Sequence, residues 1–184
     1  VRLRHAQRGL AARWVELARE NARQALRMRI ARREGYEAMY VALAKEIDWP
    51  QPPQRMECFD ISHTQGEGTV ASCVVFGPEG PLKKEYRRFN IEGVAAGDDY
   101  GALRQALERR YLRIRAGEVP RPDLLVIDGG PAQVAAVVGV LDALGFDDLP
   151  ILGVSKGPDR KPGQERLHLA RSSAPPLVPG PSSE

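Results

Sequence analysis

Two aspartates stand where apolar, strand-like runs end, and their placement indicates a shared metal site. Asp60 lies in the run 58–62, and Asp128 ends the run 125–128. An unpaired carboxylate buried in an apolar strand costs several kcal/mol, so each is expected to meet a cation, hydrogen-bond donors or a metal. Carboxylates at neighbouring strand ends can share hard cations, which take oxygen ligands. Two such ions about 4 Å apart activate a water and stabilise the leaving oxygen of a phosphodiester.

Each aspartate also has a structural alternative. Asp60 alone fits a salt-bridged structural residue, and Asp128 alone fits the N-cap of a helix that follows Gly129 and Gly130. The glycine pair could form a weak phosphate-binding turn, although no fuller glycine-rich pattern accompanies it. The two aspartates together favour the metal site, because the elements predicted below place them on the first and fourth strands of one sheet.

Basic residues form the second set of functional candidates. One cluster lies on the predicted third strand, one on the helix near 104–115, and one after the last strand. Such side chains can hold a phosphate backbone through salt-dependent contacts, and a solvated face is the alternative for each cluster. Lys156 follows the last strand and is expected nearest to the site. The DNA-binding residues that we predict are Lys156, Arg87, Arg88 and Lys161.

The histidines and cysteines have more ordinary interpretations. His63 follows the first strand, where it could contact metal or phosphate, and we favour a turn-capping role. His168 lies in an alternating run and is expected to be an exposed strand residue. Cys58 and Cys73 are too few for a disulfide framework and are expected to be buried thiols, which suits a reducing cytoplasm.

The charge is unevenly distributed along the 184 residues. The net charge is +3, but residues 1–35 hold ten arginines and three glutamates, which leaves the remainder at about −4. A basic arm before a mildly acidic body fits a nucleic-acid protein whose body carries metal-binding carboxylates, and a solvated Arg-rich helix is the alternative. No apolar run approaches the roughly 18 residues of a membrane helix, so we expect no membrane contact.

Three regions are predicted. Residues 1–54 form an Arg-rich helical segment, either one helix or two helices separated at Gly35, followed by a linker with three prolines at 49–53. Residues 55–170 form the globular body. The segment 157–184 is loop-like, and its end, 171–184, is rich in Pro and Ser with little to bury and is expected to be disordered.

The body is predicted to be a mixed α/β sheet. Strands are expected at 56–62, 69–76, 82–91, 124–127 and 150–154, with helices at 98–113 and 131–144. A leading meander of three strands followed by alternating helices and strands gives the order β-β-β-α-β-α-β, with helices on the sheet faces. This is the order of a ribonuclease H-like fold.

Several motifs, in the same order, resemble the carboxy-terminal half of the UvrC family. The most specific is the run 57–66, Glu-Cys-Phe-Asp-Ile-Ser-His-Thr-Gln-Gly. A helix at 17–22 also resembles the segment that precedes this domain in the family. The resemblance covers about residues 10–170, with further matches at 70–76, 86–91, 97–100 and 123–130.

The resemblance implies the endonuclease domain of the incision subunit of bacterial nucleotide excision repair. In the family this domain cuts DNA on the five-prime side of a lesion and uses divalent metal, here Mg²⁺ or Mn²⁺. The two catalytic, metal-binding aspartates of the family fall on Asp60 and Asp128. The implied partners are damaged double-stranded DNA and UvrB, the latter through segments absent from this chain. No small-molecule cofactor is implied, and the location is cytoplasmic.

The chain departs from the family pattern in three respects. The third catalytic residue of the family, a histidine in a downstream Arg-Asp-Glu-Ala-His-type motif, has no counterpart here. The amino-terminal nuclease domain, the UvrB-binding segment and the helix-hairpin-helix modules are also absent. Gln105 stands where relatives carry a glutamate, and Glu108 lies one turn further on. We therefore interpret the chain as a truncated endonuclease domain with weak or no activity of its own.

Two rival functions remain at this stage. The chain could be a non-catalytic module that binds nucleic acid or a repair partner on a ribonuclease H-like scaffold. It could also act on small phosphorylated molecules at the turn formed by Gly129 and Gly130, although the absence of a phosphate loop argues against this.

Overall fold

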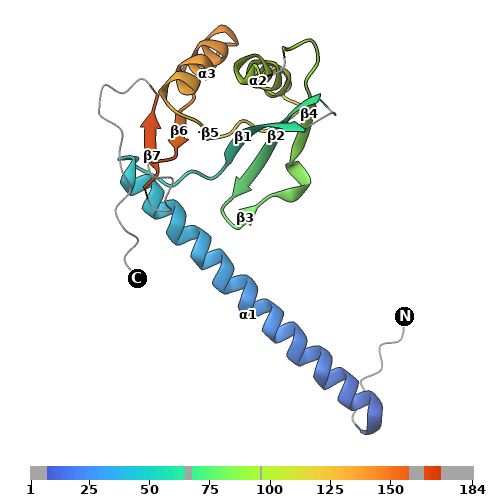
Figure 1. The fold of residues 1–184 in the computed structure, drawn as a ribbon. Helices are drawn as coiled ribbons and strands as arrows, with labels where there is room; N and C mark the ends of the chain where they lie inside the picture. The colour runs from blue at the N-terminus through green and yellow to red at the C-terminus, as the bar shows by residue number, and fades with distance from the viewer. Residues whose placement is uncertain (1–7, 65–67, 96, 158–163, 171–184) are drawn as a thin grey trace.

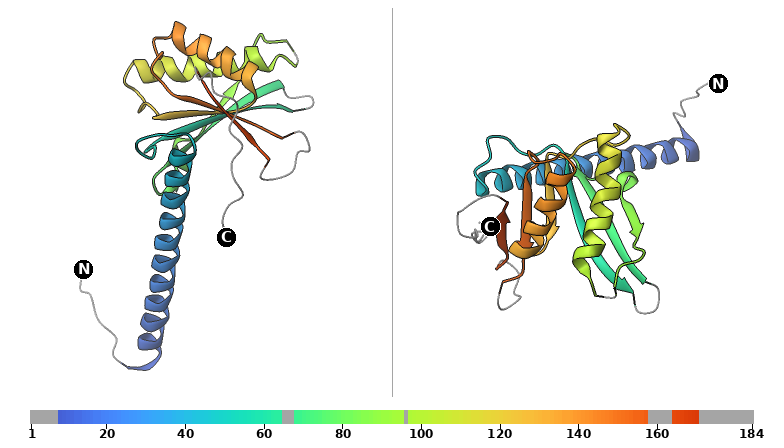
Figure 2. Two further views of the ribbon diagram at one scale, coloured as in Figure 1. Left: turned by 90° about the vertical axis from the view of Figure 1, so that its left-hand side faces the viewer. Right: turned by 90° about the horizontal axis from the view of Figure 1, so that it is seen from above.

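A long helix precedes a mixed sheet in the computed structural model, which describes residues 8–64, 68–95, 97–157 and 164–170 (Figure 1). Figure 2 shows α2 and α3 on one side of the sheet and α1 on the other. The predicted α/β class is confirmed. The elements are α1 (Gly9–Glu46), β1 (Met56–Thr64), β2 (Gly68–Gly77), β3 (Gly80–Pro81), a 3-10 turn (Lys83–Glu85), β4 (Arg87–Asn90), α2 (Asp99–Arg115), β5 (Leu124–Asp128), α3 (Pro131–Ala143), β6 (Ile151–Ser155) and β7 (Arg166–Leu169).

The sheet has the strand order β3-β2-β1-β5-β6-β7, and β4 pairs with β2 on the same edge as β3. β1 and β2 form an antiparallel hairpin, whereas β5 lies parallel to β1 and β6 lies parallel to β5. α3 connects β5 to β6, because parallel neighbours need a crossover rather than a tight turn. β7 then pairs antiparallel with β6 and closes the far edge.

Local signals fix the ends of the two covering helices. The Asp98 side chain caps α2 by accepting a hydrogen bond from the Gly101 backbone N–H at 2.9 Å. Pro131 opens α3, where its missing N–H costs nothing. After α3, Gly145 adopts a φ of 78°, a left-handed conformation that ends the helix. These ends agree closely with the sequence prediction.

Side-chain alternation divides the strands between two apolar clusters. On β1, Phe59 faces α2 and α3 and is 1% exposed, whereas Met56 faces the other side. The main core lies under the two helices and includes residues such as Ala71, Val75, Leu107, Ile127, Val137 and Ile151. The smaller cluster lies where the end of α1 crosses the opposite face, and its buried members are Ile47, Leu124, Leu152 and Leu167.

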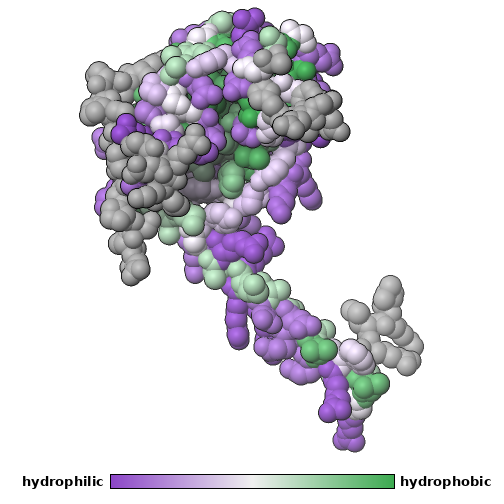
Figure 3. Space-filling model, viewed as in Figure 1, coloured by the Kyte–Doolittle hydropathy of each residue, from purple (hydrophilic) through white to green (hydrophobic). Residues whose placement is uncertain are grey.

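α1 is one continuous helix, which agrees with the first of the two predicted alternatives and excludes a break at Gly35. Its carboxy-terminal part docks on the β2–β3 hairpin, where the Tyr40 hydroxyl donates to the Gly77 carbonyl at 2.8 Å. The Tyr36 ring lies over Gly80, where a Cβ would come within 2.3 Å of it. The rest projects from the body and exposes Leu10, Trp14, Leu17, Leu26, Met28 and Ile30 among charged residues (Figure 3). No helix in the described ranges is long and apolar enough to cross a membrane.

Two further predictions need correction. The third strand, expected over 82–91, is limited to β4, because the preceding residues Lys83–Glu85 form a 3-10 turn in which backbone N–H groups bond to nearby carbonyls. The region after 157, expected to be loop, contains β7, which completes the sheet by pairing with β6. The Pro-rich segment at 49–53 contains no helix or strand, as predicted, and the tail at 171–184 lies outside the described residues.

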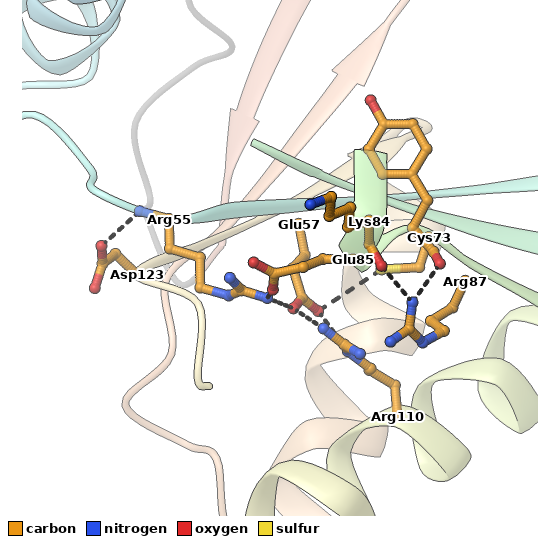
Figure 4. Close-up of polar contacts among 9 residues, drawn as sticks. Arg55, Glu57, Cys73, Lys84, Glu85, Arg87, Arg110 and Asp123 are labelled. Atoms are coloured by element: carbon orange, nitrogen blue, oxygen red, sulfur yellow. Dashed lines mark hydrogen bonds and ion pairs between the residues drawn. The ribbon is translucent and has the colours of Figure 1, made fainter. Parts of the chain in front are cut away.

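A buried ion pair joins β1 to α2 beneath the sheet (Figure 4). Glu57 has 0% exposure and Arg110 has 1%, and the guanidinium donates to both carboxylate oxygens, with Nη2–Oε1 at 2.5 Å and Nε–Oε2 at 3.1 Å. Arg55 approaches the same carboxylate at 3.4 Å and also pairs with Glu85 at 2.6 Å. Burial disfavours the charged guanidinium, but the bonds and charge of Glu57 outweigh it and raise the pKa of Arg110.

Removing one partner of this pair should be far more harmful than replacing both. We expect Glu57→Gln to lower the free energy of unfolding by about 3–5 kcal/mol, because it leaves the Arg110 charge buried and uncompensated. The double variant Glu57→Leu/Arg110→Met should lose less than Glu57→Gln. Chemical denaturation measures both, with the exposed pair partner Glu118 changed to Gln as the control, expected to cost less than about 1 kcal/mol. Equal losses in all three would contradict the assignment.

Candidate metal centre

The register of β1 and β5 places Asp60 beside Asp128. The last paired residues are Phe59 and Ile127, and each aspartate follows directly. Asp128 in turn pairs with Val154 of β6. Because neighbouring strands lie about 4.8 Å apart and one row of residues shares a face, the two carboxylates lie side by side. They occupy the face opposite α2 and α3, at the ends where β5 and β6 finish.

Both carboxylates are exposed, so the prediction that they are buried in apolar strands is wrong. The physical reason is that α1 covers only the beginning of β1 and β5 on this face, where Ile47 packs near Met56 and Leu124. Asp60 and Asp128 lie four residues further along their strands. An exposed pair suits a site that must admit a cation and a substrate. Because both carboxylates remain in contact with water, they do not incur the desolvation free energy of a buried charge.

The immediate neighbours of Asp60 on this face are Ser62 and Cys58. The Ser62 hydroxyl donates to Asp60 Oδ2 at 3.0 Å, and Oδ1 has no hydrogen-bond partner in the part of the chain that the structure describes. Burial, with the nearby charges of Asp128 and Asp60, raises the pKa of Cys58 to about 11, so the thiol is protonated at neutral pH. The sequence analysis missed Ser62, although its position two residues after Asp60 already puts it on the same face.

The donor set fits a hard divalent cation, but only in part. Carboxylate oxygens are the ligands that Mg²⁺ and Mn²⁺ prefer. Within the described ranges, however, no group of three or more His, Cys, Asp or Glu side chains could hold a metal. Two adjacent carboxylates are therefore the protein donors on this face, and the remaining positions would fall to water, phosphate or other residues.

Gln105 holds the loop at Glu92 through two hydrogen bonds and is not a candidate metal ligand. Its side-chain amide donates to the Glu92 carbonyl at 2.8 Å and its oxygen accepts from the Glu92 N–H at 3.1 Å. This requires one donor and one acceptor on the same group, which a glutamate would not supply at neutral pH. Glu108 instead pairs with Arg104 along α2 at 3.2 Å. Neither residue adds a carboxylate to Asp60 and Asp128.

The predicted DNA-binding residues fall into different places. Arg88 pairs with Ser72, which pairs with Asp60, so Arg88 shares the carboxylate face. Arg87 pairs with Cys73 on the helix side, and its Nη1 donates to the Tyr86 carbonyl at 2.7 Å and the Lys84 carbonyl at 3.1 Å. Lys156 is exposed and follows β6, two residues beyond Val154. Lys161 lies outside the described residues.

The basic cluster on α2 is largely used within the protein. Arg110 is the buried partner described above, and Arg109 lies 5.3 Å from the centre of the Phe89 ring while donating to the Asn90 carbonyl at 2.8 Å. Arg113 pairs with Glu118 at 2.9 Å. These contacts favour a structural role over the predicted phosphate contacts, because the donors already have partners.

The structure describes the side chain of His168 but only the backbone of His63. His168 is half-buried, and its Nε2 lies 2.7 Å from the Ser155 hydroxyl, so the expectation of an exposed, unengaged residue is wrong. It pairs with Gly153 on the helix side of the sheet, away from the carboxylates. The backbone of His63 belongs to β1, and its side chain lies outside what the structure describes.

The strand order and the two adjacent strand-end carboxylates define a ribonuclease H-like domain. The family model described as the UvrC RNAse H endonuclease domain matches residues 44–182, and the chain belongs to this UvrC family. UvrABC system protein C of Pseudomonas paraeruginosa is 58% identical over 162 residues, which are 88% of this chain and 27% of that protein. The Pseudomonas putida protein is 58% identical over 165 residues. The chain thus spans about a quarter of the length of these curated relatives.

Solved structures with a related arrangement are more distant. Endonuclease V of Ciona intestinalis, in a complex with inosine-containing DNA, is 12% identical with a TM-score of 0.45, over 77% of this chain and 61% of that one. The catalytic domain of human Endonuclease V is 26% identical with a TM-score of 0.41, over 56% of this chain and 45% of that one. Likeness at this level adds nothing to the family relationship.

The reactivity of Cys58 should report the charges beside it. Replacing Asp60 or Asp128 with Asn removes a negative charge, so the pKa of Cys58 should fall below about 11 and its alkylation by iodoacetamide at mildly alkaline pH should speed up severalfold. The rate is followed by mass spectrometry, with Cys58→Ser as the blank. Cys73, with 0% exposure, should stay unmodified. Unchanged rates in both aspartate variants would place the carboxylates away from the thiol.

The contact of Gln105 with Glu92 should respond to loss of its donor. We expect Gln105→Glu to lower the free energy of unfolding by about 1 kcal/mol, since one hydrogen bond is lost and a carboxylate faces the Glu92 carbonyl. The affinity for Mn²⁺ should not change. Denaturation and calorimetry measure the two effects, and Glu108→Gln is the matched control. A gain in Mn²⁺ affinity would show instead that position 105 faces the metal centre.

Proposed function

We propose that the chain is the metal-dependent endonuclease domain of a DNA excision repair subunit, and that Asp60 and Asp128 hold Mg²⁺ or Mn²⁺. The supporting observation is the placement of two exposed carboxylates on adjacent parallel strands, in a chain of the UvrC RNase H endonuclease family. A bound divalent cation would supply Lewis acidity and a water of lowered pKa at a phosphodiester.

The residues around the pair have separate roles in this proposal. Ser62 orients the Asp60 carboxylate through its hydrogen bond to Oδ2. Gly129 allows the chain to turn directly from Asp128 into α3. A larger residue would crowd Gln133, because a Cβ at position 129 would lie 1.8 Å from Gln133 Oε1. Arg88 and Lys156 lie on either side of the pair and would neutralise backbone phosphates of the bound strand.

The likeness to UvrABC system protein C supports a substrate and partners in the same repair system. We propose that the substrate is damaged double-stranded DNA, cut on the five-prime side of the lesion, and that UvrB is the partner of the longer protein, which acts in the cytoplasm. The chain alone should cut weakly, since its described residues offer two carboxylates and no third ligand. The alternative, a binding module without catalysis, is not favoured because the family is one of endonuclease domains.

Loss of either carboxylate should abolish metal binding and cutting together. Loss of an outer-shell partner alone costs about 10- to 100-fold in metal affinity, so Asp60→Asn or Asp128→Asn should cost at least that much. Calorimetric titration with Mn²⁺ measures binding, and nicking of damaged supercoiled DNA over long incubation measures cutting.

The matched control is Asp147→Asn. Asp147 is an exposed carboxylate in the turn between α3 and β6, at the opposite end of the sheet from Asp128, and its loss should leave both measurements unchanged. If Asp60→Asn binds Mn²⁺ and nicks DNA as the unchanged chain does, the proposed metal centre is wrong.

A further inference from the structure

One row of residues runs across the open face of the sheet through the carboxylate pair. Arg88 of β4 pairs with Ser72 of β2, and Ser72 pairs with Asp60 of β1. The row continues to Asp128, which pairs with Val154. Residues of one row point to the same face, so Arg88, Ser72 and Asp60 are successive on the face that carries Asp128.

Arg88 is the positively charged residue of this row, and it has no structural contact that would account for it within the described part of the chain. Its side chain is exposed, and no hydrogen bond or ion pair joins it to any residue within the described ranges. Its neighbour Arg87 differs in both respects. Arg87 belongs to the row of Cys73, whose side chain is in the main core, and it donates to two backbone carbonyls.

Ser72 lies between Arg88 and Asp60 in this row and is half-buried. Its side chain is short, so no large side chain of the row itself separates Arg88 from the carboxylates. Two strand spacings separate Arg88 from Asp60, which is roughly 10 Å. The charges of one DNA strand advance about 3.4 Å along the helix axis per nucleotide and are farther apart through space, so this separation spans at most about three nucleotides.

We infer that Arg88 binds a backbone phosphate of the cut strand within about three nucleotides of the phosphate at Asp60 and Asp128, and that Arg87 does not. This inference rests on the proposed endonuclease function and adds the direction in which the DNA strand crosses the sheet. The DNA strand crosses the sheet along the row, from β5 over β1 and the short Ser72 towards β4. The sequence places Arg87 and Arg88 together, and only the pairing separates them.

The test compares two adjacent arginines on opposite faces. Binding of the 184-residue chain to a fluorescein-labelled DNA duplex in Mg²⁺ is measured by anisotropy over a range of salt. Arg88→Ala should weaken binding about three- to tenfold and lower the slope of log K against log salt by about one, because one phosphate contact is lost. Arg88→Lys should restore the slope, since the charge is kept. Arg87→Ala should leave the slope unchanged and lower the melting temperature.

Each outcome decides the matter. An unchanged slope in Arg88→Ala, equal losses of slope in both alanine variants, or an unchanged chain that does not bind the duplex would overturn the inference. Binding is read without cutting, so these results are separate from the Mn²⁺ titration of Asp60→Asn. If Asp60→Asn has lost its Mn²⁺ affinity while Arg88→Ala binds DNA as the unchanged chain does, the endonuclease proposal is supported and the phosphate contact of Arg88 is wrong.

Discussion

The parallel pairing of β1 with β5 is the constraint on which the arrangement of the site depends. It joins strands that are separated by a hairpin, a crossover and α2, and it ends one residue before the two aspartates. A slip of one residue would turn Asp60 to the helix side, where Phe59 now packs, and would separate it from Asp128. The register therefore holds the two carboxylates side by side on an exposed face. It also directs the apolar residues that precede them on β1 and β5 into the two apolar clusters.

The two acidic residues of β1 show how that register is maintained. Glu57 and Asp60 lie three positions apart and so face opposite sides of the sheet. Glu57 is sealed beneath α2 and is compensated by Arg110, whereas Asp60 faces solvent with one hydrogen bond from Ser62. A register that buried Asp60 would expose or orphan Glu57, and burying an unpaired charge is costly. The ion pair thus acts against the alternative registers of the strand.

The arginines are divided in the same way between structure and surface. Most of those on α2 have a partner within the domain, which is a carboxylate, the Phe89 ring or a backbone carbonyl. Arg88 and Lys156 remain at the surface on either side of the carboxylates. α1 crosses the same face of the sheet at the other end of the strands, so it does not cover the carboxylates (Figure 2).

The sequence by itself determined the α/β class, the order of the main elements from β1 to β6 and the ends of α2 and α3, and it singled out the two aspartates as candidates. Apolar runs, turn residues and the Asp98, Pro131 and Gly145 signals act locally, so they are legible without a fold. The motif around Asp60 likewise identified the family that the comparisons confirmed. The shorter third strand and β7 were not predicted, since the 3-10 turn depends on its own carbonyl contacts and β7 forms by pairing with β6.

Only the tertiary structure decided which face each residue occupies and what stands beside it. No local pattern marks Glu57 as buried, and its burial depends on the ion pair with Arg110, 53 positions away. Exposure of Asp60 and Asp128 depends on where α1 stops covering the sheet, which no local pattern records. Arg87 and Arg88 are equivalent in sequence, and they differ because strand pairing assigns neighbours to opposite faces.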